Sequence, residues 1–367
     1  MFKAEELFQN ITDKNHPDET VLTIIQGKGT LPREQAGRNI HYDDASLSNY
    51  KKVEQGDFII HLRSFEGGLE MANEAGIVSP AYTILRCKCP HSSLFYDAYF
   101  HTDEFINHNL SKSVEGIRDG RQISYEAFKW LGIPYCEPTE QEKISNLFAA
   151  LNERIAKQRD LVESLKKYKR GLLMHYFSDD NTLQWKQYTI SQIGKVITGS
   201  TPPTNDRSNY DGDLLFCSPG DIGDQKYISS TEKRVSPKGF ALGRVIPPSS
   251  VIVTCIGLIG KLGIATTDMI TNQQINALIV SEDFDHEFIY YAFENFFPKY
   301  RSKVSMQTLP ILSKSEFERL LIKVPNLNVQ HKISNYLAGM DKRIEHTQQE
   351  LNMLQELRRG IIQKLFI

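Results

Sequence analysis

The sequence predicts a mixed α+β protein duplicated in tandem, with two compact α+β domains, each followed by one long helix. The two helices are predicted to pair as an antiparallel coiled coil with pseudo-twofold symmetry. Three observations predict this fold: a repeated segment, a helical spacing of apolar residues in both copies, and short strands punctuated by glycine and proline between them. The predicted boundaries are 1–137 for the first domain, 138–178 for the first helix, 179–325 for the second domain and 326–367 for the second helix.

The repeat is an ungapped match between 141–177 and 330–366, at an offset of 189 residues. Twelve of its 37 aligned positions are identical, and both copies contain the letters KISN near their start. Two unrelated amphipathic helices would share leucines and charges. They would not share the matched glycines or the pair Phe177/Phe366, so we interpret the match as a duplication.

Both copies carry apolar residues every three or four positions, close to the 3.5-residue repeat of a coiled coil. Thr139 followed by Glu142 predicts a capping box at the start of the first helix, and Asn328 is the matching N-cap of the second. Pro138 and Pro325 are expected just before the helices. At 1.5 Å per residue, each helix is about 55 Å long.

A helix with one apolar stripe must bury it, either against its own domain or against the other copy. The order domain, helix, domain, helix favours pairing of the copies, since the second helix can return toward the first domain. The matched Gly171/Gly360 pair suggests a close approach to the helix backbone. The predicted seam consists of Leu151, Ile155, Leu165, Ile344, Leu351 and Leu354.

Charged residues on the same helices are expected on the outer faces. There they are either solvated surface or a docking surface for partners, and the sequence does not choose between the two. These residues are Arg154, Lys157, Lys166, Lys169, Arg343 and Arg358.

The two intervening domains are also related to each other. Segments 53–85 and 246–279 each hold a turn, a buried strand, a glycine-rich link and a second apolar stretch, in the same order. The letters are weakly similar, but the order of the features is the same. The sequence therefore predicts two versions of one mixed domain, with shared scaffolding and distinct targets.

Composition is typical of a soluble globular protein, with 40% apolar and 24% charged residues. The net charge is −2, and no segment forms a basic arm. Binding to nucleic acid would therefore rely on local patches or on a basic partner. The N-terminus has no apolar secretory core, the apolar run 251–260 is too short to cross a bilayer, and five cysteines in no regular framework favour a reduced cytosol.

Motifs that carry catalysis are missing from the sequence. GLIGKLG has a Gly-Lys pair but neither the spacing nor the hydroxyl of a phosphate-binding loop, and GKGTLP ends in proline where a third glycine belongs. CKCPH at 87–91 has no second Cys/His pair at a suitable spacing, so these cysteines are expected to be plain strand residues. No catalytic residue and no metal site is predicted.

Several stretches together resemble a known family, the specificity subunit of Type I restriction–modification systems. TGSTPP, CSPGDI, VIVTCIGLIGKLGIA and TNQQINALI follow one another in the second domain in the order of that family's target recognition domain. QGDFIIHLRSFEGGLE and GIVSPAYTIL match another version of it in the first domain, and the long helices resemble the family's two spacer regions.

The resemblance implies a function without chemistry in this chain. Such subunits select a split target in double-stranded DNA: each domain reads one part, and the helices set the unread gap. Two methyltransferase (modification) subunits and a motor–nuclease (restriction) subunit would be the partners. They would carry S-adenosylmethionine, ATP and Mg, and the complex would act in cytoplasmic host defence.

The first domain departs from the family pattern at its start. The second domain opens with Trp185, which is typical of the family, whereas aligning Leu7 with Ile193 places Met1 opposite Gln187. We therefore expect the first domain to lack its opening residues.

Polar residues in loops are the candidates for DNA contacts, because Arg, Lys, Asn, Gln, Ser and Thr read base edges and hold phosphates. For each of them the alternative is an ordinary solvated or turn-forming side chain. In the first domain they are Lys28, Arg33, Arg38, Arg63, Ser64, Ser79 and Tyr82. In the second domain they are Ser200, Thr201, Thr204, Asn205, Arg207, Lys226, Tyr227, Lys261, Asn272, Gln273 and Gln274.

Two other classes of function remain open from the sequence. One is a non-catalytic coiled-coil scaffold that joins two protein-binding domains. The other, a stand-alone nuclease or methyltransferase, is disfavoured by the missing motifs. A preference of the complex for one DNA sequence would separate recognition from scaffolding.

Overall fold

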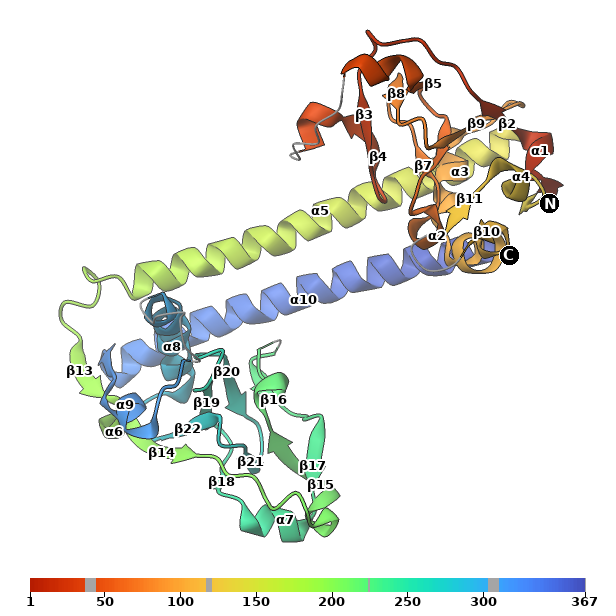
Figure 1. Ribbon diagram of the computed structural model, residues 1–367. Helices are drawn as coiled ribbons and strands as arrows, with labels where there is room; N and C mark the ends of the chain where they lie inside the picture. Colours follow the sequence, from red (N-terminus) through yellow and green to blue (C-terminus); the bar gives the residue numbers. More distant parts are fainter. Residues whose placement is uncertain (37–43, 117–120, 224, 303–309, 367) are drawn as a thin grey trace. The chain divides into compact units, whose positions relative to one another are not determined.

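The computed structural model describes residues 1–36, 44–116, 121–223, 225–302 and 310–366. It divides into two compact units, and each unit contains part of both long helices. The first unit comprises Met1–Asp160 with Gln348–Ile367, and the second comprises Leu161–Thr347. Figure 1 labels the helices and strands. Within the described residues, no helix is both long enough and apolar enough to span a membrane.

The first unit combines short strands with short helices. Its strands are β1 (Phe2–Lys3), β2 (Phe8–Ile11), β3 (Leu22–Ile25), β4 (Gly29–Pro32), β5 (Lys51–Val53), β6 (Phe58–Ile60), β7 (Glu70–Met71), β8 (Gly76–Val78), β9 (Thr83–Cys87), β10 (Val114–Glu115), β11 (Gln122–Ile123) and β12 (Gly132–Ile133). Its helices are α1 (Ala4–Leu7), α2 (Ser64–Gly67), α3 (Ser93–Phe100), α4 (Tyr125–Phe128), the first part of α5 (Pro138–Tyr176) and the end of α10 (Leu327–Phe366).

The second unit has longer strands and a larger sheet. Its strands are β13 (Lys186–Thr189), β14 (Gly194–Thr198), β15 (Tyr210–Cys217), β16 (Tyr227–Ile228), β17 (Lys233–Val235), β18 (Val245–Ile246), β19 (Val251–Thr254), β20 (Leu262–Ala265), β21 (Met269–Thr271), β22 (Ile275–Val280) and β23 (Leu321–Val324). Besides the rest of α5 and α10, its helices are α6 (Ile190–Ile193), α7 (Pro237–Leu242), α8 (His286–Arg301) and α9 (Lys314–Arg319).

The strand order confirms that the two domains are versions of one fold. The first unit contains an antiparallel sheet in the order β2-β9-β6-β7, and the second repeats it as β14-β22-β19-β20, with β16 added in parallel at the edge. The pairing of β1 with β12 matches that of β13 with β23. The opening strand of the first domain is thus present in a two-residue form, where the second domain has four residues.

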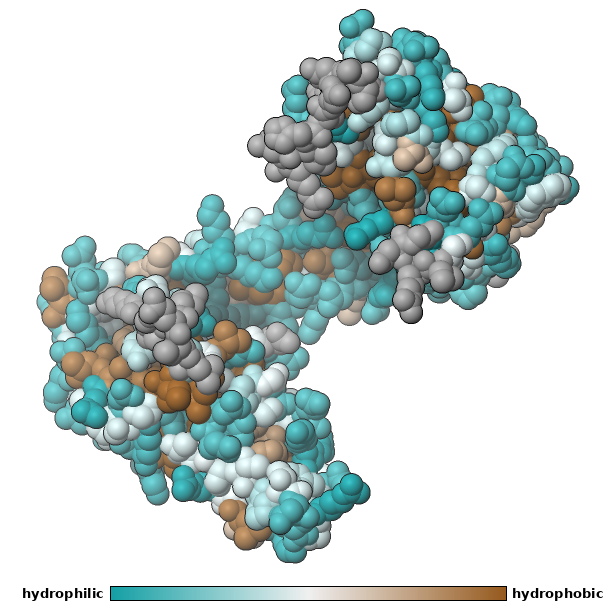
Figure 2. Space-filling view, in the orientation of Figure 1, coloured by the Kyte–Doolittle hydropathy of each residue, from teal (hydrophilic) through white to brown (hydrophobic). Residues whose placement is uncertain are grey.

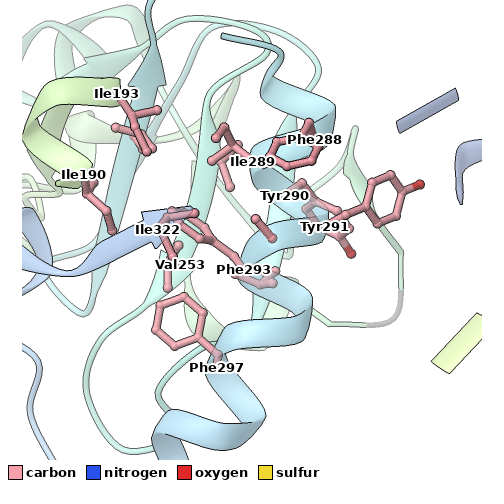
Figure 3. Close-up of a cluster of buried hydrophobic side chains, with 14 of the residues drawn as sticks. Ile190, Ile193, Val253, Phe288, Ile289, Tyr290, Tyr291, Phe293, Phe297 and Ile322 are labelled. Carbon is pink, nitrogen blue, oxygen red and sulfur yellow. The ribbon is translucent and has the colours of Figure 1, made fainter. Parts of the chain in front are cut away.

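Helix α8 closes the core of the second unit. Figure 3 shows Phe288, Phe293 and Phe297 on its inner side, among Val253 of the sheet and the isoleucines of α6. All four residues of β19 are buried, as expected of a β-branched strand at the centre of a sheet. Tyr291 is also fully buried, and its hydroxyl donates to Asp341 Oδ2 of α10 at 2.5 Å.

The first turns of each long helix form hydrogen bonds with the N-terminus of a shorter helix in a domain. In the first unit, buried Gln141 accepts a hydrogen bond from Ser92 N, the N-cap of α3, at 2.9 Å, and donates one to Cys136 O at 2.8 Å. One turn later, the hydroxyl of Ser145 lies 2.7 Å from that of Ser92. The first turns of α5 therefore satisfy backbone groups that would otherwise be buried without partners.

The second unit repeats this arrangement with the equivalent residues of the repeat. Gln330 accepts from Asp285 N, the N-cap of α8, at 2.9 Å and donates to Pro325 O at 2.9 Å, while Ser334 donates to the carboxylate of Asp285. The serine of each KISN segment thus faces inward and is almost fully buried.

Each long helix ends with a phenylalanine against a domain helix. Phe366, the last residue of α10, lies 5.2 Å from Phe95 of α3 between ring centroids, within the first unit. Phe177, just beyond α5, lies 5.4 Å from Phe288 of α8 within the second unit. Each domain is therefore held by the first turns of one long helix and the final phenylalanine of the other.

Within each unit the two helices are antiparallel. In the first unit, Arg358 Nε donates to Asn152 Oδ1 at 2.8 Å, and the rings of Phe148 and Phe366 stack at 6.4 Å. In the second unit, Lys169 Nζ lies 2.7 Å from Asp341 Oδ1. Residue numbers fall along α10 as they rise along α5, as an antiparallel pair requires.

The predicted seam residues are all buried or half-buried. Leu151, Ile155, Leu165 and Leu351 are at most 9% exposed, whereas Ile344 and Leu354 are half-buried. The helices also have apolar residues that reach the surface, so the apolar positions of the repeat form more than one stripe. Figure 2 shows some of this hydrophobic surface over the long helices.

The structure corrects the predicted helix starts. Pro138 is the first residue of α5, not the residue before it, and Glu137 O accepts from Glu140 N and Gln141 N, so Thr139 is not the N-cap. In α10 the N-cap is Asn326 instead of Asn328, because Asn326 Oδ1 accepts from Val329 N at 3.1 Å. Asn326 and Asn328 are both good N-cap residues, so the sequence does not show which of them begins the helix.

Two other expectations for the helices were wrong. A Cβ placed on Gly171 or Gly360 would meet no atom of the described residues within 4 Å, so no close approach among them explains the matched glycines. Lys169 and Arg358 do not lie on outer faces. They occupy equivalent positions of the repeat and turn inward, each to a polar side chain of the other helix.

Candidate nucleic-acid interface

Two loops of the second domain meet at one edge of its sheet. The loop after β14 begins with Gly199 and Ser200, whose amides donate to Ile275 O at 3.0 Å and Thr271 O at 2.8 Å. Beyond them, Thr201 Oγ1 donates to Gln273 Oε1 at 2.6 Å. Backbone and side-chain hydrogen bonds thus join the loop to the turn between β21 and β22, and both Thr201 and Gln273 are exposed.

Glycine is required where the two segments approach most closely. A Cβ on Gly199 would stand 2.2 Å from Asn272 O and 2.2 Å from Thr271 Oγ1, well inside contact distance. The TGSTPP stretch therefore carries a glycine because another backbone lies against it. The sequence alone does not identify this neighbour, which lies more than 70 positions along the chain.

The turn between β21 and β22 presents Gln273 to the surface. Asn272 Oδ1 accepts from Gln274 N at 3.1 Å, and Asn272 Nδ2 donates to Gln274 Oε1 at 3.1 Å. The side chains of Asn272 and Gln274 thus hold the turn. Next to the turn, the hydroxyls of Ser200 and Thr271 are buried and have no hydrogen-bond partner among the described residues.

The rest of the loop is anchored at Asp206. Lys238 Nζ and Ser208 N donate to its carboxylate at 2.8 and 3.0 Å, and the hydrogen bonds of Lys238 and Ser208 lower the pKa of Asp206 to about 2. The predicted residues Thr204, Asn205 and Arg207 flank this anchor and are exposed. A fixed loop with available polar side chains can read base edges at little cost in ordering.

Sequence reasoning missed Arg244, which belongs to the same surface. It is exposed, and its Nη1 donates to Thr198 O at 3.0 Å, at the end of β14. Its position just before β18 made it an ordinary loop arginine in the sequence. A prediction of the sheet order would have placed it beside the loop after β14.

The structure corrects one predicted contact of the second domain. Lys226 is 9% exposed in its side chain, forms an ion pair with Glu287 and donates to Tyr291 OH at 2.7 Å, so it has a structural role. Tyr227 is 45% exposed and donates its hydroxyl to Glu287 at 2.7 Å, which leaves its ring at the surface. Burial and this hydrogen bond raise the pKa of Tyr227. Lys261 is half-buried, near Gly223.

In the first domain, a buried carboxylate positions the loop that carries Lys28. Glu70 is fully buried, and its two oxygens accept from Gly27 N at 2.6 Å and Gly29 N at 2.9 Å. Lys28 lies between these glycines, at the exposed turn of the β3–β4 hairpin. Nothing in the sequence links Glu70 to this turn.

A histidine shares the buried carboxylate. His101 Nε2 lies 3.3 Å from Glu70 Oε1, and His101 Nδ1 lies 3.5 Å from Asp97 Oδ1. Burial lowers the pKa of His101, but the hydrogen bond to Glu70 and the nearby carboxylates outweigh it, so the net shift is upward. Burial likewise raises the pKa of Glu70, and the bonds from His101 and from Gly27 N outweigh it, so the net shift is downward.

The other predicted residues of the first domain differ in availability. Arg63 is exposed at the start of α2. Ser64 is fully buried and accepts from His61 N at 2.9 Å, so it is not available to DNA, and that prediction was wrong. Ser79 and half-buried Tyr82 form a turn, Arg33 stacks over Tyr50 at 5.9 Å, and Arg38 lies outside the described residues.

No metal site is evident in the part of the chain that the structure describes, where no group of three or more His, Cys, Asp or Glu side chains is placed to hold an ion. The sulfur atoms of Cys87 and Cys89 lie 3.6 Å apart, and burial raises the pKa of Cys87 to about 12. Both are free cysteines, with Cys87 at the end of β9 and Cys89 beyond it.

Comparison with known families gives a match to the Type I restriction modification DNA specificity domain, over residues 183–356. Two curated relatives are similar. The Type I restriction enzyme MjaIX specificity subunit of Methanocaldococcus jannaschii is 28% identical over 50% of this chain and 44% of its own length. The HindI specificity subunit of Haemophilus influenzae is 31% identical over 29% of this chain and 24% of its own length. The matched region is thus less than half of either relative.

Solved structures resemble the fold over almost the whole chain. A structure from work on complex assembly and conformational transition of the type I R-M system has a TM-score of 0.61 at 18% identity, and covers 99% of this chain and 96% of its own. The specificity subunit from M. genitalium has a TM-score of 0.59 at 14% identity, covering 100% and 95%. The HsdS subunit from Thermoanaerobacter tengcongensis has a TM-score of 0.51 at 17% identity, covering 100% and 95%. Residues 183–356, which hold most of the second domain and much of α10, are thus similar to the Type I restriction modification DNA specificity domain, and the chain shares the fold of solved specificity subunits.

Proposed function

We propose that the chain recognises a bipartite target in double-stranded DNA, with one half-site read by each domain, and directs partner subunits to that target. The observation that carries the proposal is the hydrogen-bonded pair of loops around Thr201 and Gln273. There, exposed Thr, Asn, Gln and Arg side chains are fixed to the edge of a sheet. These are the residue types that read base edges and hold phosphates.

The first domain offers a smaller surface for the same task. The exposed side chains of Lys28 and Arg63 stand on a hairpin turn and at the start of a short helix, and the turn is fixed by Glu70. The two domains share the sheet order but differ in these loops. Different loops on one scaffold are suited to different half-sites, which supports bipartite recognition over a scaffold without a DNA role.

The partners in this proposal are two copies of a methyltransferase subunit and a motor–nuclease subunit, acting in the cytoplasm. Adenine methylation and cleavage, and with them S-adenosylmethionine, ATP and Mg, belong to those subunits. The long helices are suited to bind the methyltransferases, because large apolar side chains remain exposed there. In the first unit these are Leu147, Met353, Leu357 and Leu365, and in the second they are Leu161, Tyr168, Met174 and Tyr336.

The test is the sequence preference of the complex with its methyltransferase subunit, measured by methylation of a randomised DNA library. Gln273→Ala is expected to relax the half-site read by the second domain, and Arg63→Ala the half-site read by the first. Each loss should be about tenfold to a hundredfold, as for one base-reading contact worth about 1–3 kcal/mol. Lys143→Ala, at an exposed position of α5, is the control.

Three outcomes would count against the proposal. A complex without any sequence preference would favour the scaffold. Equal relaxation of both half-sites by either variant would contradict the assignment of one half-site to one domain. Methylation or cleavage of DNA by the isolated chain would contradict the absence of chemistry.

A further inference from the structure

A hollow lined by three arginines opens beside the paired helices of the first unit. Its volume is about 460 Å³. It is lined by Asn152, Ile155, Arg159, Gln355, Arg358 and Arg359, all of them within this unit. Five of the six side chains are polar and the sixth is aliphatic. The lining therefore suits an anionic ligand, and it has no aromatic side chain on which a nucleotide base could stack.

The positive charge of the hollow is not neutralised by the described residues. Arg159 and Arg359 are exposed and take part in no hydrogen bond or ion pair within the described part of the chain. Arg358 is half-buried, and its Nε donates a hydrogen bond to Asn152, which is uncharged. The charge of Asp97 acts on Arg358, but Asp97 forms its own ion pair with His101 at 3.5 Å.

The second unit provides an internal comparison at the equivalent positions of the repeat. Lys169 stands where the first unit has Arg358, and it contacts the carboxylates of Asp341 at 2.7 Å and Glu294 at 2.9 Å. Lys166 stands where the first unit has Gln355 and is paired with Glu163 at 3.1 Å. The residue equivalent to Arg358 is thus paired with two carboxylates in the second unit, whereas Arg358 bonds an amide in the first.

One of these differences lies at the residue that bridges the two helices. Asn152 of the first unit aligns with Asp341 of the second, so the basic residue that bridges the helices meets an amide in one unit and a charge in the other. A half-buried guanidinium with a neutral partner retains donors for a ligand. Guanidinium groups bind phosphate through two parallel N–H donors more readily than ammonium groups do.

We infer that the hollow around Arg159, Arg358 and Arg359 binds phosphate groups. The source is either the DNA backbone between the two half-sites or a free polyphosphate. Both present the same chemistry, two or more phosphates within reach of three guanidinium groups. The DNA source rests on the proposed function, whereas binding of a free polyphosphate does not.

The first experiment is a calorimetric titration of the full-length chain with pyrophosphate at low salt. The wild type is expected to bind saturably, and the double variant Arg159→Gln/Arg359→Gln to bind at least tenfold more weakly. Arg170→Gln is the matched control, because Arg170 aligns with Arg359 and is exposed, but does not line the hollow. Arg159→Lys/Arg359→Lys keeps the charge but loses the bidentate donors, so it should restore part of the binding.

The second experiment separates the two sources through the salt dependence of binding to target DNA. The slope of log K against log salt is negative, and removing one phosphate contact makes it less steep by about 0.9. If the slope is less steep for the double variant than for Arg170→Gln, the hollow binds the DNA backbone. If the double variant loses pyrophosphate binding but its slope is unchanged, the ligand of the hollow is a free polyphosphate.

The inference is overturned in two cases. One is a wild-type chain that does not bind pyrophosphate, together with a DNA slope that the double variant leaves unchanged. The other is an equal loss in Arg170→Gln, which would show general electrostatic attraction. Because Arg159 and Arg359 are exposed, all variants are expected to unfold at the wild-type temperature, and each single variant provides the same readout.

Discussion

Gln141 Oε1 accepts a hydrogen bond from Ser92 N at 2.9 Å, and through it the first turns of α5 hold the N-terminus of α3. Gln330 makes the equivalent bond to Asp285 N, also at 2.9 Å. The repeated segment at the start of each long helix is therefore a clamp on a domain helix. Both glutamines are at most 2% exposed, so these bonds are shielded from water.

The first prediction concerns this clamp. Gln141→Ala leaves Ser92 N and Cys136 O without their partner, and a buried unpaired group costs about 1–3 kcal/mol. We expect the free energy of unfolding, measured with urea, to fall by about 2 kcal/mol, and Gln330→Ala to behave alike. Lys143→Ala, two residues along and exposed, should change it by less than about 0.5 kcal/mol. Equal effects at 141 and 143 would refute the clamp.

The second prediction concerns the two matched helix glycines. Since a Cβ at Gly171 or Gly360 meets nothing within 4 Å, alanine fits there and removes the helical cost of glycine. Gly171→Ala and Gly360→Ala should each raise the free energy of unfolding by about 0.5–1 kcal/mol. Calorimetry of the single and double variants measures it. A fall in the unfolding temperature would mean that another surface lies against these glycines.

The third prediction concerns the close approach at Gly199. Gly199→Ala forces the loop after β14 away from the β21–β22 turn, because the new Cβ would lie 2.2 Å from Asn272 O. We expect discrimination at the half-site read by the second domain to fall by about tenfold, equivalent to about 1.4 kcal/mol. The other half-site should be unchanged. Methylation of a randomised DNA library measures both.

Gly220→Ala is the control for this loop prediction. Gly220 lies in the same domain, and a Cβ there would stand 3.9 Å from its nearest neighbour, Ser218 Oγ. It should leave both half-sites as they are. If the two glycine variants lose specificity equally, the contact between the loop and the turn is not what positions the readers.

The fourth prediction concerns pH and the pair His101 and Glu70. The folded pKa of His101 lies above its usual 6.5, so its contribution is present below about pH 6.5 and is lost as the pH rises through the raised pKa. The folded pKa of Glu70 lies below its usual 4.5, so its contribution is present above about pH 4.5 and is lost as the pH falls through the lowered pKa.

Unfolding temperatures measured from about pH 2 to about pH 9 check this pH dependence. His101→Gln should flatten the loss of stability on the alkaline side, and Glu70→Gln the loss on the acid side. A pH profile of His101→Gln that superimposes on the wild type above pH 6.5 would refute the role of the histidine.

Local signals in the sequence were enough to predict the architecture. The 37-residue match and its apolar period predicted α5 and α10, and the shared order of strand, glycine link and strand predicted two related domains. These are features of residues close together in the chain, or of two copies compared with each other. Both helix starts were missed by two residues, because several nearby residues could cap them.

The candidate site was predicted less completely, for a physical reason. In the sequence, Lys226 and Ser64 look like polar loop residues that are available to a ligand. Lys226 is instead paired with Glu287, which lies 61 positions further along the chain and is not recognisable as its partner from the sequence. Ser64 is unavailable because it is fully buried. Glu70, Arg244 and the inward serines of KISN act through partners that only the folded sheet order brings close. Polarity was readable from the sequence, whereas availability to a ligand was not.

The end phenylalanines and the glutamine clamps have a consequence for divergence. The polar and aromatic contacts that both domains share at the helices are few: one helix with a backbone N–H and a hydroxyl or carboxylate at its first turn, and one phenylalanine near its start. The loops proposed to read DNA lie outside these shared contacts. If the proposed function holds, a domain with other loops that kept these contacts would give the same helices a new target preference.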